Sequence, residues 1–190
     1  MNKLVLSITL LLSTLYLMAQ QDVAVKFVAT KNKDVNAAFN FVQYNVDPLL
    51  NKSETLKGKL TFAAPRKLSM IYSVPEGDKF VIDGDFLVNV KGKKTNKVNL
   101  KKVKSMAGLA DLLCNAMMGK ISEIEHDTKS VMTFTSGKTT FVFVFKADKK
   151  SRSYYKEVEV RYDKKTGRIV YMKLIEKSGK YSEYQMTAKT

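Results

Sequence analysis

The chain of 190 residues has one cysteine, one histidine and no tryptophan, and these shortages exclude several classes of protein. A single cysteine cannot form an internal disulfide, so the fold must depend on packing. Cys114 lies in a helical pattern, which indicates a buried structural thiol rather than a reactive one. His126 cannot build a multi-histidine metal site, and its two acidic neighbours indicate a surface turn. With no glycine-rich phosphate loop and no Gly-x-Ser-x-Gly elbow, we expect neither an enzyme nor a bound cofactor or metal.

Acidic residues are also scarce, because 18 Asp and Glu stand against 33 Lys and Arg, for a formal net charge of +15. In a cytosolic chain this excess would suggest nucleic acid. This chain lacks a basic–aromatic recognition motif, and its N-terminus indicates a signal for export. We therefore expect it to bind no nucleic acid, and to bind an anionic membrane surface or an acidic protein partner instead. The densest lysine cluster is either a docking patch or a solvated loop, and it consists of Lys91, Lys93, Lys94, Lys97, Lys101, Lys102 and Lys104.

Only one long apolar run is present, from Leu4 to Leu17, and it follows the basic Lys3. It is too short to span a bilayer with ordinary flanks, so it predicts a secretory signal peptide over residues 1–20, cleaved after Ala19 or Gln20. An uncleaved membrane anchor is the less favoured alternative. Because no cysteine stands at the cleavage site, we do not expect the protein itself to be lipidated.

The region from Gly58 to Val90 contains four short amphipathic strands in succession. Apolar and polar residues alternate in each strand, and Pro75-Glu76-Gly77 and Asp83-Gly84 mark turns. The apolar positions of this region include Leu60, Phe62, Leu68, Met70, Tyr72, Phe80, Ile82, Phe86 and Val88. A meander of this kind has one solvated face and one apolar concave face, which suits the binding of lipid.

The period becomes helical between Ser105 and Met118, with Ser105 as the expected N-cap and Gly119 as the expected stop. The apolar face of this helix includes Leu109, Leu112, Leu113 and Met117. A short helix is also predicted at 22–32, and further strands at 37–46, 131–135, 139–146, 154–162, 169–175 and 181–186. Inward-facing residues of these later strands include Phe141, Phe143, Phe145, Val158, Val160 and Met172.

These elements predict one mainly β (α+β) domain over residues 21–190. The expected architecture is an incomplete antiparallel β-barrel, or curved meander, of about 9–11 strands covered by a short helical lid. The run Phe141 to Phe145 is apolar on both faces, so we expect it to be covered on both sides. Nine Met and ten Phe favour a lipid-sized cavity over a solid core. The choice stays open, because both interiors use alternating apolar residues.

The order of these motifs resembles the outer-membrane lipoprotein carrier (LolA-like) family of periplasmic chaperones. The motifs are G-K-L-x-F-x-x-P at Gly58 to Pro65, the strand Leu68 to Tyr72, the turn Pro75 to Gly77, Ile82-Asp83-Gly84, and LLCNAMMGKI at Leu112 to Ile121. The resemblance implies a non-enzymatic periplasmic carrier whose apolar cavity, formed by the inward positions named above, holds lipoprotein acyl chains. It also implies an inner-membrane lipoprotein-releasing ABC transporter as donor and an outer-membrane acceptor as recipient. We expect a monomer.

Two features depart from the family pattern. Well-studied members have a lid-latching arginine directly before the strand proline, where this chain has Ala64. Arg66 should point to the opposite face, so we expect the latch to differ or to be absent. The chain also stops soon after Met186, where the family usually continues, and we expect a missing closing strand and a more open cavity.

Three other functions compete with lipoprotein carriage. One is an envelope sensor or protein-interaction module of LolA-like fold, which would need a filled interior and an exposed partner surface. Another is a carrier of a different lipid. An acceptor-type lipoprotein of similar fold is disfavoured, because the chain has no lipidation cysteine.

Overall fold

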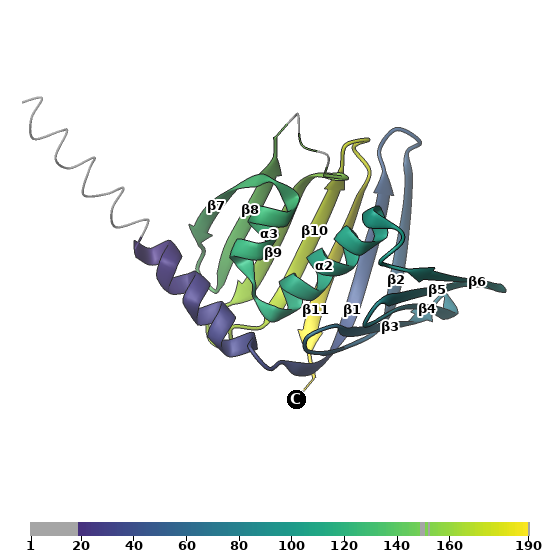
Figure 1. Ribbon diagram of the computed structural model, residues 1–190, viewed down its shortest axis with the longest axis horizontal. Coiled ribbons are helices and arrows are strands. Elements are labelled where there is room, and N and C mark those ends of the chain that lie inside the picture. Colours follow the sequence, from purple (N-terminus) through teal and green to yellow (C-terminus); the bar gives the residue numbers. More distant parts are fainter. Residues whose placement is uncertain (1–18, 149–150, 152, 190) are drawn as a thin grey trace, which may run out of the picture.

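The computed structural model describes residues 19–148, 151 and 153–189. Its main feature is an antiparallel sheet of eleven strands, which Figure 1 shows behind two short helices. The strands are β1 Asn36–Asp47, β2 Lys52–Ala63, β3 Lys67–Val74, β4 Glu76–Asp83, β5 Phe86–Lys91, β6 Lys94–Asn99, β7 Ser130–Ser136, β8 Thr140–Ala147, β9 Tyr155–Asp163, β10 Ile169–Glu176 and β11 Tyr181–Ala188. Every strand expected from the sequence is present, and the predicted mainly β fold is confirmed.

The sheet is open, with the spatial order β6-β5-β4-β3-β2-β1-β11-β10-β9-β8-β7. The last strand, β11, lies at the centre of the sheet, where it pairs with β1 and with β10. It therefore joins the two halves of the sheet. The edges are β6 and β7, so the opening lies between these two strands and not beside the last strand of the chain.

The lysine-rich segment after Val90 is a hairpin rather than a loop. β6 pairs with β5 over six residues, from Phe86 opposite Asn99 to Lys91 opposite Lys94. The sequence does not reveal this strand, because Val98 is its one apolar residue and no alternation is visible. Lysines on an edge strand also oppose pairing with another chain.

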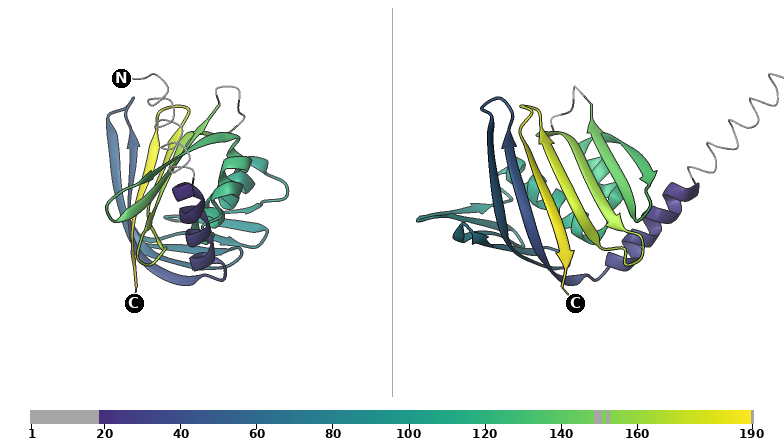
Figure 2. Two further views of the ribbon diagram at one scale, coloured as in Figure 1. Left: turned by 90° about the vertical axis from the view of Figure 1, so that its left-hand side faces the viewer. Right: turned by 180° about the vertical axis from the view of Figure 1, so that it is seen from behind.

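Three helices lie on the concave side of the sheet, as the views in Figures 1 and 2 show. They are the N-terminal helix (described residues 19–32), α2 Lys104–Met118 and α3 Ile121–Thr128. α2 ends at Gly119, whose φ of 66° is the left-handed conformation expected at the predicted stop. The predicted N-cap is wrong, because Val103 occupies the cap position and Ser105 already lies inside the first turn.

Helix α3 was not predicted. Its buried residues are Ile121 and Ile124 alone, which are too few to reveal a helical period. It places His126 in its last turn, with the side chain exposed, where the sequence predicted a surface turn.

The N-terminal helix is fastened to the rest of the domain at its C-terminal end. Val28 is fully buried against Gly119, where an added Cβ would lie 2.6 Å from the Cγ1 atom of Val28. Asn32 is buried as well, and its side-chain amide donates to the carbonyls of Val28 and Gly167, both at 2.8 Å. The predicted signal peptide, residues 1–20, lies outside the described residues apart from its last two.

Strand β8 is covered on one face only. Phe143 and Phe145 are buried under the helices, whereas Val142 and Val144 on the outer face are half-buried. The expectation of cover on both faces is wrong, because no helix of the described chain lies on the convex side (Figure 2).

Candidate functional site

Helix α2 packs so closely on the concave face that the predicted interior is closed. The space that remains between α2 and the sheet is about 10 Å³, hardly enough for one water molecule. This space, which we call the seam, is lined by Leu60, Leu68, Met70, Leu113, Ala116, Met117, Ile169, Met172, Tyr184 and Met186. The sequence did not decide between a cavity and a solid core, and in this conformation the interior is packed.

An open groove adjoins the seam along α2. Its volume is about 590 Å³, which is within the range of small-molecule sites. It lies between α2, α3 and the ends of β9 and β10, and its apolar walls include Met106, Leu109, Leu112, Ile124, Tyr154 and Tyr155. Leu112 lines the groove and the next residue, Leu113, lines the seam, so the two spaces lie on different sides of α2.

A third space makes one end of the concave face polar. This polar hollow has a volume of about 860 Å³, lies between the β1–β2 and β10–β11 turns, and shares Glu176 with the groove. The Oδ1 atom of Asn45 accepts hydrogen bonds from Nε2 of Gln43 and Oγ of Ser182, both at 2.8 Å. The hydroxyl of Tyr72 donates to Oε1 of Gln43 at 3.0 Å. Burial raises the pKa of Tyr72 above its usual range, so this hydroxyl stays a donor.

Two polar contacts fasten α2 to the sheet. The Nη1 atom of Arg66 forms an ion pair with Oδ1 of Asp111, near the middle of α2. The hydroxyl of Tyr162, on β9, donates to the carbonyl of Ala116 at 2.7 Å, and Tyr162 is fully buried. Burial raises the pKa of Tyr162 far above its usual value, so the hydroxyl keeps its proton. α2 is therefore held once near the surface and once inside.

The position of Arg66 corrects the expectation that it points away from the helices. Residues 64–66 form the turn between β2 and β3, so the alternation of faces within a strand does not apply to them. The carbonyl of Arg66 also accepts the N–H of Gly84 at 3.0 Å, which holds this turn against the next one. Arg66 thus contacts the helix although Ala64 stands where the resemblance led us to expect a latching arginine.

Removing this ion pair should loosen α2 without unfolding the protein. The side chains of Arg66 and Asp111 are 31% and 38% exposed, so solvent screens the pair. We expect Arg66→Gln to lower the free energy of unfolding by about 1 kcal/mol or less. Asp111→Asn should have a similar effect, and the double variant should lose no more than either single one. Urea unfolding measures all three, and additive losses would show that the two residues act separately.

The lone cysteine is a buried thiol in this arrangement. Cys114 is buried in α2, and burial raises the pKa of its thiol to about 11. In the part of the chain that the structure describes, no group of three His, Cys, Asp or Glu residues could hold a metal ion. Within the same residues, none of the helices is long and apolar enough to cross a membrane.

The residues predicted for the cavity fall in several places. Those that line the seam are Leu60, Leu68, Met70, Leu113, Met117 and Met172. Those that line the groove are Leu109 and Leu112. Those buried in the core outside both spaces are Phe62, Ile82, Phe143, Phe145, Val158 and Val160. Half-buried against that core are Tyr72, Phe80 and Phe141.

Phe86 and Val88 lie on the wrong face for a cavity. The two-residue turn after Asp83 places Asp83 opposite Phe86, so these two residues share a face, and Ile82 pairs with Leu87. Leu87 is therefore the inward residue, with 3% of its surface exposed, whereas Phe86 is 42% exposed. Alternation counted from Phe86 fails, because a shift of one residue moves a whole strand to the other face.

Several lining residues were not among the predicted ones. Ile124 was missed because α3 itself was not predicted. Tyr184 alternates with Met186 on the inner face of β11, and that alternation was a usable signal. Gln43 and Asn45 carry no signal, since polar residues on an inner face interrupt the pattern on which the prediction depends.

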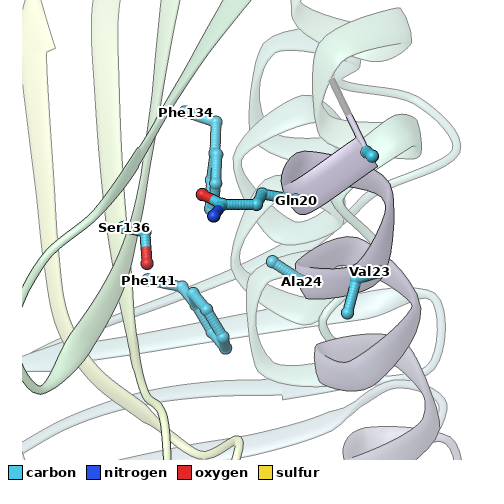
Figure 3. A pocket seen from close by; sticks show the side chains of 7 residues that line it. Gln20, Val23, Ala24, Phe134, Ser136 and Phe141 are labelled. Atoms are coloured by element: carbon cyan, nitrogen blue, oxygen red, sulfur yellow. The ribbon is translucent and has the colours of Figure 1, made fainter. Parts of the chain in front are cut away.

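A further hollow, of about 360 Å³, separates the N-terminal helix from β7 and β8. Figure 3 shows Phe134 and Phe141 on the strands, with Gln20 and Ala24 on the facing helix. Phe141 also meets Phe27 edge to face, with 6.0 Å between ring centroids. Phe141, which was predicted for the cavity under the lid, therefore lines this hollow and neither the groove nor the seam.

The seven lysines of the predicted docking patch are all exposed, on the β5–β6 hairpin, in the turn between β6 and α2, and at the start of α2. Lys101 pairs with Asp85 at 2.6 Å, and Lys97 lies 4.6 Å from the ring centroid of Phe86. Lys91 and Lys94 face each other across the hairpin. Lys97 lies on the outward face with Phe86 and Val88, whereas Lys91 and Lys94 alternate to the other face. The cluster is therefore continuous in sequence but divided between two faces of the sheet.

Comparisons with known proteins agree with the resemblance seen in the sequence. Residues 31–190 match the family model described as outer membrane lipoprotein carrier protein LolA. No curated protein matches the chain. The solved LolA superfamily protein NE2245 from Nitrosomonas europaea is similar at 9% identity and a TM-score of 0.40, over 86% of this chain and 91% of that chain.

Two other solved structures are similar to a comparable degree. For an outer membrane lipoprotein-sorting protein domain from Vibrio parahaemolyticus the identity is 13% and the TM-score 0.42, over 88% of this chain and 91% of that chain. For LprF from Mycobacterium bovis the identity is 9% and the TM-score 0.43, over 90% and 91%. The family match extends from the end of the N-terminal helix to the last strand, and the chain therefore belongs to the LolA family of outer membrane lipoprotein carrier proteins.

Proposed function

We propose that this protein carries the acyl chains of lipoproteins through the periplasm. Family membership supports a carrier without enzymatic activity. The observation that supports the proposal most directly is the apolar groove of about 590 Å³ beside α2, next to a seam of flexible apolar side chains. In this proposal an acyl chain first lies in the groove and then enters the seam as α2 moves away from the sheet.

Hydrophobic transfer can supply the free energy for this step. Each buried methylene contributes about 0.8 kcal/mol, so a long acyl chain binds strongly without specific polar contacts. Opening the seam costs the contacts of Leu113 and Met117, and the cargo must bind the open state better than the closed one to shift the equilibrium. Flexible methionines at positions 70, 117, 172 and 186 can repack around chains of different shape.

In this proposal the polar hollow fixes the orientation of the bound lipoprotein. It shares Glu176 with the groove, so an amphiphile with its acyl chain in the groove can place its polar end among Gln43, Asn45 and Ser182. We propose that the glyceryl group and first residues of a lipoprotein occupy this hollow. Donor and recipient in the proposal are an inner-membrane lipoprotein-releasing ABC transporter and an outer-membrane acceptor, and residues 1–20 are a signal peptide for export.

A block placed in the groove should weaken binding of an acyl probe. Gly108 lies on the groove wall, and an added Cβ would have no atom within 4 Å. We expect Gly108→Trp to fill the groove and weaken binding of a fluorescent fatty acid by at least about tenfold, the value of two lost methylene contacts. Gly108→Ala is the matched control and should bind as the unmodified protein does. Native mass spectrometry of the unmodified protein should also show bound lipid.

Absence of any acyl binding by the unmodified protein would overturn the proposal. Equal binding by Gly108→Trp and Gly108→Ala would place the ligand elsewhere. Urea unfolding of both variants shows whether the fold is kept.

The packed seam favours one second candidate, an envelope sensor or protein-interaction module of the same fold. Such a protein needs no open interior. It predicts a protein partner in pull-downs from the native envelope and no lipid mass in the native spectrum, the opposite of the result expected for a carrier.

A further inference from the structure

The convex face of the sheet has two halves that differ in charge balance. In the half formed by β8–β11, basic and acidic side chains pair with each other. Lys146 and Glu157 are 3.7 Å apart, Arg161 and Glu159 are 2.5 Å apart, and Lys173 and Glu183 are 3.9 Å apart. The charges of this half therefore balance locally.

The half formed by β2–β6 has no such balance. Its outward side chains form three rows across five strands, as the strand register shows. The rows are Lys59–Ile71–Lys79–Val90–Thr95, Thr61–Ser69–Val81–Val88–Lys97 and Ala63–Lys67–Asp83–Phe86–Asn99. Asp83 is the one carboxylate in these rows, 3.8 Å from Lys67. Among the described residues, no ion pair joins Lys59, Lys79 or Lys97 to a carboxylate.

Apolar side chains lie between these lysines and are open to solvent. Phe86 is 42% exposed and Ile71 is 51% exposed, while Val88 and its neighbours on this face are half-buried. The ammonium of Lys97 lies over the Phe86 ring, 4.6 Å from its centroid. No described helix covers this side of the sheet, as the rear view in Figure 2 shows. We call these three rows the basic convex face.

We propose that the basic convex face docks the protein on an anionic phospholipid surface. Phosphate groups would meet the lysines, and Phe86 and Ile71 would enter the boundary between headgroups and acyl chains. Lysine side chains suit this setting, since their stems lie along apolar surface while the ammonium groups stay in the polar layer. The groove lies on the concave side, so docking would leave it accessible. Of the seven clustered lysines, Lys97 alone belongs to this face.

Vesicle flotation tests the proposal. The protein should bind vesicles of phosphatidylcholine mixed with phosphatidylglycerol. It should not bind vesicles that contain only phosphatidylcholine. The double variant Lys59→Gln, Lys79→Gln should lower the partition coefficient about 30-fold, because each lysine near an anionic surface contributes about fivefold. Phe86→Ser should lower it further. The matched control is Lys146→Gln, Lys173→Gln, which removes the same charge from the β8–β11 half and should bind normally.

Equal loss in the two double variants would overturn the proposal, because net charge alone would then explain binding. Failure to bind either vesicle would overturn it as well and would favour an acidic protein as the partner of this face. The fatty-acid titration is a separate measurement, and none of these three variants should change it. A carrier that binds acyl chains but no vesicle would therefore lose this proposal and keep the proposed function.

Discussion

Leu113→Ala should lose stability and bind acyl chains more tightly. Leu113 is 5% exposed and lines the seam with Met70 and Met117. Truncation of a buried leucine costs about 2–5 kcal/mol, part of it for the cavity that remains. This cost falls on the closed conformation, in which the side chain of residue 113 fills the seam. In the open conformation the acyl chain fills the seam instead, so the truncation costs little there. The open conformation then becomes more populated, and we expect the affinity for a fluorescent fatty acid to rise about tenfold or more.

Leu87→Ala is the matched control for this prediction. Leu87 is 3% exposed on the inner face of β5 but lines neither the seam nor the groove. It should lose a similar free energy of unfolding without any gain in affinity. Urea unfolding and fatty-acid titration measure the two quantities in the same samples. If Leu113→Ala is destabilised while its affinity stays unchanged, the acyl chain does not enter the seam.

Phe143→Asp should not fold. Phe143 is fully buried, with its ring centroid 5.3 Å from that of Phe134 and 5.9 Å from that of Tyr162. Loss of the ring costs about 3–5 kcal/mol, and an unpaired buried carboxylate adds several more. The sum is comparable with the whole stability of an ordinary domain, about 5–15 kcal/mol. The depth of Phe143 in the core therefore leaves the carboxylate without solvent or a partner.

The neighbouring residue supplies the control. Val142 is half-buried on the outer face of β8 and lies opposite Arg161 in the strand register. Val142→Asp should therefore stay folded, with a cooperative thermal transition in circular dichroism. A folded Phe143→Asp together with an unfolded Val142→Asp would mean that the inner and outer faces of β8 are exchanged.

The sequence predicted strand existence well, because period-2 alternation is a local property of each strand. Leu60, Leu68 and Met70 were placed correctly on an inner face, and Gly119 was recognised as the end of α2. The sequence failed where a local signal was weak or absent. β6 has a single apolar residue and α3 has two buried ones, so neither shows a period.

The length of a turn decides which residues of the following strand face inward. Phe86 looked like the continuation of an inner face, but the two-residue turn pairs it with Asp83 and turns it outward. The same shift places Phe86 beside Lys97 and helps to create the basic convex face. Cross-strand register brings residues from five strands together, and no local pattern contains that information.

By itself the sequence determined the class of fold, the open meander with helices and the family, since alternation, turns and motif order are written along the chain. The tertiary structure alone decided whether the interior is filled, which face Phe86 takes, and how α2 is held by Arg66 and Tyr162. The physical reason is that these features depend on distances between segments far apart in the chain. Packing of α2 against the sheet fills the seam, and only a contact across 45 residues joins Arg66 to Asp111.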